Sequence, residues 1–295
     1  MVDVELMLFE RGRFDAVSPA ALMAPVSPLV ALLRRHRLGA VDDAQLAEAV
    51  QGFRDSDVRN EFSRYFYRNG LNQQYSLQLS GSADKLAWRT SFGHDRNSSE
   101  LGAGYQRTNL NISALLTPLK GLEVSLGLLL TRSLSAGGRP GYGSVSVPGG
   151  ELPMYTRFAG DDGRPLAVAK DYSLAYLQGL PAALLDWKYY PLEDYTHTDV
   201  SSRLDDVLLD IGLRQKLAKG LQGELSYRNQ QQRTDGENLY GQQSYFVRNL
   251  VNNFSQLNVQ SGALSYKVPL GAILDKSIGR RPSYNLRGQL NYNAA

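Results

Sequence analysis

The stretch that decides the fold contains NQQYSLQLSG (72–81), KLAWRTSFG (85–93), NLNISALLTP (109–118) and LEVSLGLLL (122–130). Apolar and polar residues alternate with a period of two in each segment, and Leu129 is the one clear exception. This period is typical of β-strands that have one apolar face. Each segment holds about ten residues, the length that crosses a bilayer at a tilt. The pattern therefore favours a membrane barrel wall, although alternation alone also fits a soluble sandwich.

The connections between the segments support the same interpretation. Tight polar turns are predicted at 81–85, 117–121 and 218–220, whereas the link at 94–104 is longer. Outer-membrane barrels have short turns at one end of their strands and long loops at the other. About eight antiparallel strands in four hairpins are expected, because further alternating segments occur at 207–217, 221–231, 262–268 and 283–293.

The expected fold is all-β, a partial transmembrane barrel wall with a small helical extracellular insert. The insert is predicted at 1–70, where Ser27 and either Asp42 or Asp43 can cap helices, and a third short helix is expected from Asp57 to about Tyr65. The barrel portion is predicted at 71–295, with long loops at 134–206 and 232–260. An open, curved sheet with exposed edges near residues 72 and 292 is expected, since eight strands do not close a wide barrel.

Composition narrows the class of protein. The 295 residues include no cysteine, 17 tyrosines and no run of 18 apolar residues, so a helical membrane span, a disulfide scaffold and a thiolate metal site are excluded. A mean hydropathy of -0.33 suits a barrel, because half of each strand is polar. The net charge of +3 is too close to zero to indicate a nucleic-acid-binding protein. The first nine residues lack the features of an export signal, so an internal segment of a longer exported protein is expected.

Four aromatic residues in the first long loop are candidate contacts for a substrate or a partner. They are Trp187, Tyr189, Tyr190 and Tyr195. Their rings could stack on sugar rings or peptide side chains, or they could pack the loop itself, which is the commoner use of such rings. Calcium ligands are a weaker possibility, because no ordered calcium-loop spacing occurs among Glu193, Asp194, Asp199, Asp205 and Asp206.

The polar strand faces provide candidate lumen residues. Their expected members are Arg89, Glu123, Glu224 and Arg228, whereas Leu126 and Leu128 are expected to face lipid. Catalytic chemistry is not indicated, because His36, His94 and His197 have no motif partners. No phosphate loop, dinucleotide fingerprint or metal-ligand pair occurs either. The expectation is therefore a protein without catalytic residues, metal or cofactor.

Several segments resemble the SusC/RagA family of TonB-dependent outer-membrane transporters. The similarity is carried, in order, by DVRNEFSRYFYR (57–68), NQQYSLQLSG (72–81), TPLKGLEV (117–124), LLDWKYYPL (184–192) and SYNLRGQLNY (283–292). The resemblance covers nearly the whole chain, and the ordered succession is more specific than any one piece. It implies a plugged barrel of about 22 strands.

The same resemblance implies partners and a location. A SusD-like surface lipoprotein, energy supplied through TonB, and import of oligosaccharides or peptides across the cell outer membrane are expected. No segment resembles the family's signal peptide, amino-terminal domain, TonB box, plug or closing strand. The alternative interpretation is a soluble all-β glycan-binding module, whose apolar faces would pack together as a sandwich.

The turn pattern predicts an orientation. If the tight turns face the periplasm, the helical region lies outside the cell. A single cysteine introduced as Ala44→Cys should then react with a membrane-impermeant maleimide in intact cells. Labelling only after permeabilisation would contradict this orientation.

Overall fold

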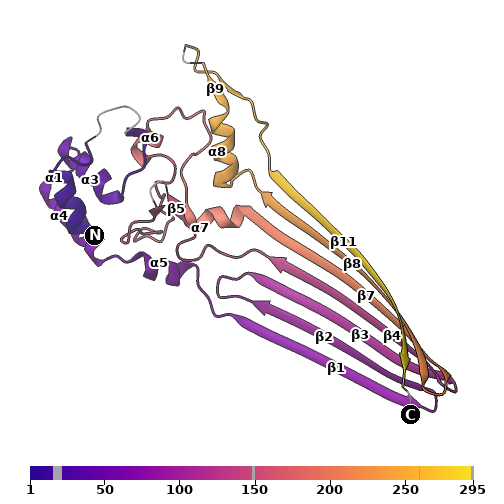
Figure 1. The fold of residues 1–295 in the computed structure, drawn as a ribbon. Coiled ribbons are helices and arrows are strands. Elements are labelled where there is room, and N and C mark those ends of the chain that lie inside the picture. Colours follow the sequence, from indigo (N-terminus) through magenta and orange to yellow (C-terminus); the bar gives the residue numbers. More distant parts are fainter. Residues whose placement is uncertain (16–21, 148–149, 259, 294–295) are drawn as a thin grey trace. The chain divides into compact units, whose positions relative to one another are not determined.

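A computed structural model describes residues 1–15, 22–147, 150–258 and 260–293 and divides into two compact units. The first unit, a mixture of helices and loops, comprises Met1–Arg68, Arg139–Asp199 and Leu239–Leu274. The second unit, a sheet, comprises Asn69–Gly138, Val200–Asn238 and Asp275–Ala295. The chain enters the first unit before the first long strand and again within two links between strands (Figure 1).

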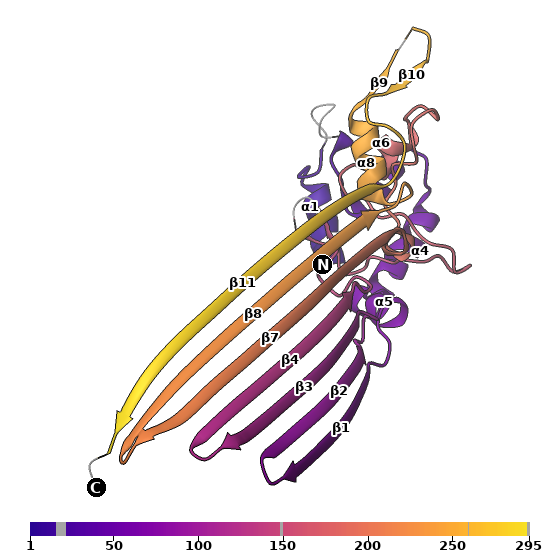
Figure 2. The same ribbon diagram turned by 90° about the vertical axis from the view of Figure 1, so that its right-hand side faces the viewer.

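The second unit is one sheet of seven strands in the order β1-β2-β3-β4-β7-β8-β11 (Figure 2). Its members are β1 (Leu71–Ala83), β2 (Leu86–Ser98), β3 (Gly104–Leu119), β4 (Leu122–Ala136), β7 (Thr198–Ala218), β8 (Leu221–Tyr240) and β11 (Ile273–Tyr292). Pairing is antiparallel from β1 through β7. Within the described chain, β1 and β11 each pair along one edge only. The predicted all-β, antiparallel, open wall is confirmed.

The sheet differs from the prediction in strand number and length. The segment predicted at 262–268 contributes only β10 (Leu264–Tyr266), which pairs with β9 (Ser255–Leu257) in a separate two-stranded sheet. Pro269, which has no backbone N–H, follows shortly after and does not support a long strand. The main sheet therefore has seven strands instead of about eight. Its last two strands extend well beyond the predicted 221–231 and 283–293.

Tight turns join the strands at one end of the sheet. Ala83 pairs with Leu86 and Leu119 with Leu122, so two residues form each of these turns. Gly121 and Gly220 adopt φ values of +82° and +76°, a region that side-chain-bearing residues disfavour. The strands thus continue into segments that the sequence pattern assigned to turns.

The register sorts side chains onto two faces. Leu77, Phe92, Leu110, Leu130 and Val207 pair in one row across five strands, and we call their side the apolar face. The opposite side, the polar face, carries the row Ser80, Arg89, Ser113, Gly127 and Asp210. Large side chains on the apolar face are exposed, including Leu77 at 58% and Phe92 at 44%. Among the described residues, every buried hydrophobic side chain belongs to the first unit.

The first unit contains helices, most of which begin at a residue whose side chain caps the helix. They are α1 (Val2–Glu10), α3 (Pro28–Arg37), α4 (Asp43–Asp55), α5 (Val58–Tyr65), α6 (Leu174–Gln178), α7 (Pro191–Asp194) with the 3-10 turn η1 (Tyr195–His197), and α8 (Tyr245–Asn253). Ser27 accepts a hydrogen bond from the Val30 N–H at 3.2 Å, and Asp42 forms a capping box with Gln45. The short strands β5 (Ser146–Val147) and β6 (Gly150–Glu151) pair with each other. None of the described helices has the length and apolar character that a membrane crossing requires.

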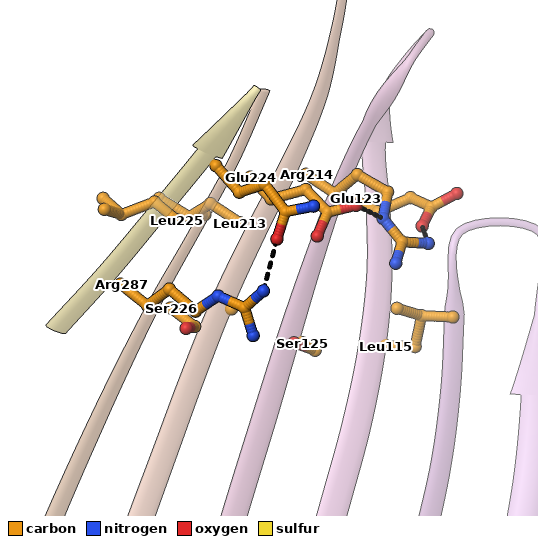
Figure 3. A pocket seen from close by; sticks show the side chains of 11 residues that line it. Leu115, Glu123, Ser125, Leu213, Arg214, Glu224, Leu225, Ser226 and Arg287 are labelled. Atoms are coloured by element: carbon orange, nitrogen blue, oxygen red, sulfur yellow. Dashed lines mark hydrogen bonds and ion pairs between the residues drawn. The ribbon is translucent and has the colours of Figure 1, made fainter. Parts of the chain in front are cut away.

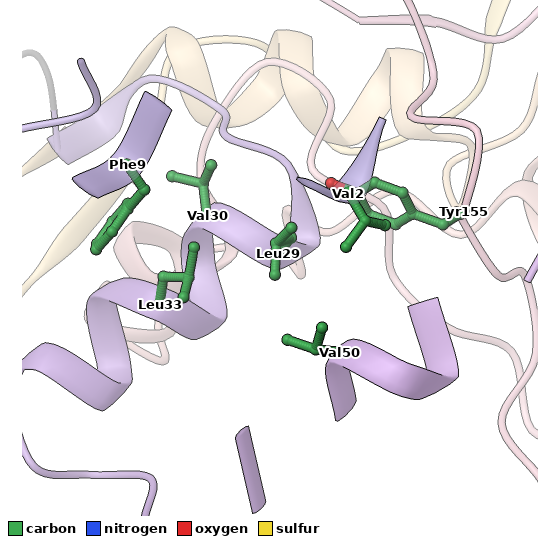
Figure 4. Packing of buried hydrophobic residues seen from close by; sticks show 7 residues of the cluster. All are labelled: Val2, Phe9, Leu29, Val30, Leu33, Val50 and Tyr155. Carbon is green, nitrogen blue, oxygen red and sulfur yellow. The ribbon is translucent and has the colours of Figure 1, made fainter. Parts of the chain in front are cut away.

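The first unit has its own hydrophobic core. Side chains from α1, α3 and α4 pack around Leu29, which is fully buried, and Tyr155 closes the cluster from the long loop (Figure 4). The cluster comprises Val2, Phe9, Leu29, Val30, Leu33, Val50 and Tyr155. The Tyr155 hydroxyl donates to Glu5, which in turn accepts from the Ser27 hydroxyl at 2.7 Å. Helices and loop are therefore joined by both apolar and polar contacts.

This core predicts a large effect of truncating Leu29. Leu29→Ala should lower the free energy of unfolding of the first unit by about 2 to 5 kcal/mol, because it removes buried methyl groups and leaves a cavity. Leu38→Ala is the matched control: Leu38 is 84% exposed, and a change of less than about 0.5 kcal/mol is expected. Urea unfolding followed by near-UV circular dichroism measures both. Equal losses would contradict the placement of Leu29.

Candidate functional site on the polar face of the sheet

An ion cluster crosses three neighbouring strands on the polar face. Arg214 of β7 pairs with Glu123 of β4 at 3.3 Å and with Glu224 of β8 at 3.1 Å (Figure 3). The register places Glu123 directly opposite Arg214, so the sheet itself sets the first contact. Gln222 also donates to Glu224 at 2.7 Å. One arginine thereby holds two carboxylates of different strands on one surface.

This cluster borders a shallow cavity of about 270 Å³. Ser125, Ser226, Arg287 and Gln289 complete much of its polar lining (Figure 3). Gly212 lets the Ser125 hydroxyl lie close to the β7 backbone, because a Cβ at this position would be 2.3 Å from the Ser125 Oγ. With two arginines and two glutamates, the lining carries balanced charge. It offers both donors and acceptors to a polar solute and holds no arrangement of nucleophile and base.

The structure shows where the four candidate lumen residues lie. Glu123 and Glu224 share Arg214, and Arg228 pairs with Asp210 on the same face at 2.6 Å. Arg89 lies on this face in the row of Ser113 and Gly127, two strands away from β4. Leu126 and Leu128 occupy the opposite, apolar face. The four polar residues thus share one surface, although only Glu123 and Glu224 join one ion cluster.

The candidate aromatic residues pack within the first unit. Tyr189 is only 6% exposed, its ring contacts the edge of Tyr245, and the Lys170 Nζ lies 4.3 Å from the ring centroid. Burial raises the pKa of Tyr189 above its ordinary value. Trp187 donates from Nε1 to Asn249 at 2.8 Å. The observed contacts of these side chains organise the loop.

The other two aromatics have similar surroundings. The Tyr195 ring lies edge-on to Phe66 at 5.8 Å, and the Tyr190 carbonyl accepts the N–H of Glu193 at 3.1 Å. Both side chains are half-buried. The Tyr195 ring therefore packs within the loop, and both side chains retain some exposed surface.

The acidic residues considered for calcium serve other contacts. Asp194 accepts the Tyr245 N–H at 2.5 Å, Asp205 pairs with two arginines, and Asp206 accepts from Gln230 at 3.0 Å. Within the part of the chain that the structure describes, no three His, Asp or Glu side chains gather closely enough to hold a metal ion.

A groove of about 1020 Å³ in the first unit was not predicted from the sequence. Its lining is largely apolar and includes Arg34, Arg35, Tyr155, Thr156, Arg157 and Tyr176. The Thr156 Oγ1 is buried and has no hydrogen-bond partner among the described residues. None of the four candidate aromatics lines this groove. The adjacent pair Arg34 and Arg35 is the sequence feature that could have indicated this groove. Such a pair is equally typical of an ordinary helix C-terminus.

No protein-family model and no curated protein matches the chain. Among solved structures, this chain is similar to a protein chain of the structure described as "Structure of the RagAB peptide importer in the 'closed-closed' state". The TM-score is 0.46 and the sequence identity is 9%. The similarity covers 78% of this chain and 30% of that chain. The chain thus spans less than a third of that neighbour's length.

The buried tyrosines predict a loss of stability at high pH. Burial and a 2.6 Å hydrogen bond to Asp171 raise the pKa of Tyr245 above its ordinary value of 10.0. The folded state therefore keeps this proton to a higher pH than the unfolded state, and the resulting stabilisation is complete below pH 10 and lost above it. The urea midpoint of the first unit should be level at neutral pH and decline above pH 10.

Tyr245→Phe tests the source of this decline. The variant keeps the ring contact with Tyr189. Its free energy of unfolding at neutral pH should be about 1 kcal/mol lower, because the hydrogen bond to Asp171 is lost. Its urea midpoint should decline less steeply above pH 10. Tyr142→Phe is the control, because it removes an exposed phenol. Identical slopes for the two variants would contradict the role of Tyr245.

Proposed function

We propose that this chain forms part of the barrel wall of a SusC/RagA-like TonB-dependent transporter in the cell outer membrane. The cargo would be oligosaccharides or peptides, delivered with a SusD-like lipoprotein and driven through TonB. The observation that carries the proposal is the exposed apolar face of the seven-stranded sheet. The proposal also draws on the resemblance of the sequence segments to this family.

The apolar face requires a surrounding other than water. Contiguous apolar patches larger than a few hundred Å² are uncommon on soluble monomers. A soluble sandwich would cover this face with a second sheet, but the other sheets in the described residues have only two strands each. Lipid chains supply the missing cover. The soluble glycan-binding alternative therefore receives less support.

Aromatic residues on the apolar face fit this interpretation. Tyr75 stacks on His94 toward the loop end of the sheet, and Trp88 packs over Gly81 toward the turn end. Six residues separate these two rows in β1, which corresponds to about 20 Å along the strand. Transmembrane barrels carry an apolar band about 25 Å tall between girdles of aromatic residues.

The polar face would line the lumen of the barrel. Barrel interiors are polar, and alternate residues of each strand point inward. The paired charges of Glu123, Arg214 and Glu224, together with Arg228 and Asp210, suit such a water-filled surface. Arg89 would face the same lumen. These residues would contact polar cargo or the inner surface of a plug.

The open edges support a wall that continues into further strands. In hydrocarbon, each unpaired backbone N–H or C=O costs several kcal/mol, and the described edges of β1 and β11 carry a row of such groups. Additional strands on both edges would satisfy them. In this arrangement the links opposite the tight turns face the cell exterior. The groove and the half-buried aromatics of the first unit would then meet cargo or the lipoprotein.

Substitutions on the two faces test the proposal. Leu126→Arg should destabilise the membrane-inserted protein by about 2 to 4 kcal/mol near mid-bilayer, because the charge would enter lipid. Glu123→Gln should cost less than about 1 kcal/mol, since its partner Arg214 is 53% exposed. The amount of folded protein in isolated outer membranes measures both effects.

The same preparation tests the location. Recovery with the outer membrane and partition into a detergent phase support the proposal. Equal losses for Leu126→Arg and Glu123→Gln would contradict the lipid-facing assignment. Recovery of the unaltered protein as a soluble monomer would overturn the transporter proposal and favour the binding module.

A further inference from the structure

A group of charged residues interrupts the apolar face toward its loop end. The last apolar row contains Leu110, Leu130 and Val207. In the next row of the same face, Arg132 pairs with Asp205 across β4 and β7. One row further, Arg203 lies opposite Leu134. The first charged side chains therefore lie one row, or about 7 Å along the strands, beyond a continuous apolar surface.

One carboxylate orients two guanidinium groups in this cluster. The Arg132 Nε donates to Asp205 Oδ1 at 2.6 Å, and the Arg203 Nε donates to Asp205 Oδ2 at 2.7 Å. Both bonds use Nε, and no acceptor in the described chain engages the terminal nitrogens of either arginine. The two side chains are 58% and 47% exposed. Four terminal nitrogens thus remain open to an external acceptor.

A third arginine extends the positive charge along the same face. Arg96 of β2 belongs to the row of Gln106 and Leu134, which also contains Arg203. Three strand spacings separate Arg96 from Arg203, or about 14 Å at Cα. Arg96 has no ion pair among the described residues. With Asp205 as the one acidic member, this cluster carries a net charge of +2.

We propose that Arg96, Arg132 and Arg203 bind the phosphate groups of a membrane lipid headgroup in the outer leaflet. This inference rests on the proposed transmembrane function and adds a ligand to it. Guanidinium groups bind phosphate oxygens with pairs of N–H donors. The adjoining row of Leu110, Leu130 and Val207 would contact the acyl chains of the same molecule. A ligand that combines phosphate with hydrocarbon matches both halves of the surface, whereas free phosphate uses only one.

An ion pair with a purely structural role is the competing explanation. Exposed ion pairs usually contribute only about 0 to 1 kcal/mol to stability. A structural pair requires a single arginine for Asp205, whereas two arginines share it here and retain their terminal nitrogens. A third, unpaired arginine on the same face has no role in a structural pair. These features distinguish a ligand site from a stabilising contact.

Binding of diphosphorylated lipid A to the intact protein in dodecylmaltoside micelles tests the inference. The double variant Arg132→Gln/Arg203→Gln should bind the lipid about twenty-five-fold more weakly, because each arginine near an anionic membrane surface contributes a factor of about five to affinity. Arg107→Gln is the matched control. Arg107 belongs to the same part of the sheet, opposite Ser133, but lies on the polar face. Its affinity for the lipid should equal that of the unaltered protein.

Two comparisons identify the bound chemistry. Dephosphorylated lipid A should bind at least as weakly as the double variant binds the phosphorylated lipid, because the variant retains Arg96. Millimolar inorganic phosphate should not displace the lipid. Equal binding of both lipid forms would overturn the proposal, as would equal effects of the double variant and Arg107→Gln. Full displacement by inorganic phosphate would indicate a simple anion site and also overturn it. Partition of each variant into a detergent phase tests the proposed transmembrane function separately. A variant that loses lipid binding but still partitions into detergent is therefore altered only at the lipid site.

Discussion

The exposed apolar face of a single sheet is the constraint on which the rest of this structure depends. Backbone pairing fixes seven strands side by side, and the period of two then places an apolar side chain at every second position of one surface. The described sheet unit contains no buried hydrophobic side chain that could stabilise it from within. Backbone hydrogen bonds therefore hold the strands together, and the proposed barrel wall would supply the apolar surrounding that this face lacks within the described chain.

The two units are stabilised in different ways. The first unit buries its own core around Leu29 and joins helices to loop through Tyr155, Glu5 and Ser27. Its aromatic residues mostly complete this packing, as the burial of Tyr189 illustrates. A folded unit of this kind can present a defined groove without support from lipid. The sheet unit instead keeps its charged groups on the surface, where the cross-strand register decides which of them meet.

Charge on the two faces of the sheet has two different arrangements. On the polar face, Arg214 lies between Glu123 and Glu224, and Arg287 in the same cavity lining brings the charges into balance. On the apolar face, the charged cluster begins only where the apolar rows end, and Arg132 and Arg203 outnumber Asp205. The same strands thus carry a neutral polar surface on one face and a positive rim at the end of the apolar rows on the other. Strand pairing produces both arrangements, because each cluster contains residues from at least two strands.

The sequence by itself determined the strand class, the two-faced character of the sheet and the helix starts at Ser27, at Asp42 or Asp43, and at Asp57, because side-chain period and capping act between near neighbours in the chain. The structure selects Asp42. The sequence also placed Arg89, Glu123, Glu224 and Arg228 in polar positions of their segments. It missed the second half of β8, where nearly all residues on both faces are polar. It also missed the first half of β11, where Lys276 and Arg280 interrupt the alternate apolar positions of Leu274 and Ile278. In both segments, pairing with neighbouring strands maintains the extended backbone. Only the tertiary structure decided that 262–268 leaves the main sheet, that Arg214 joins Glu123 to Glu224, and that the apolar lining of a groove gathers beside Arg34 and Arg35. These features depend on contacts between residues far apart in the chain, which local periodicity does not encode.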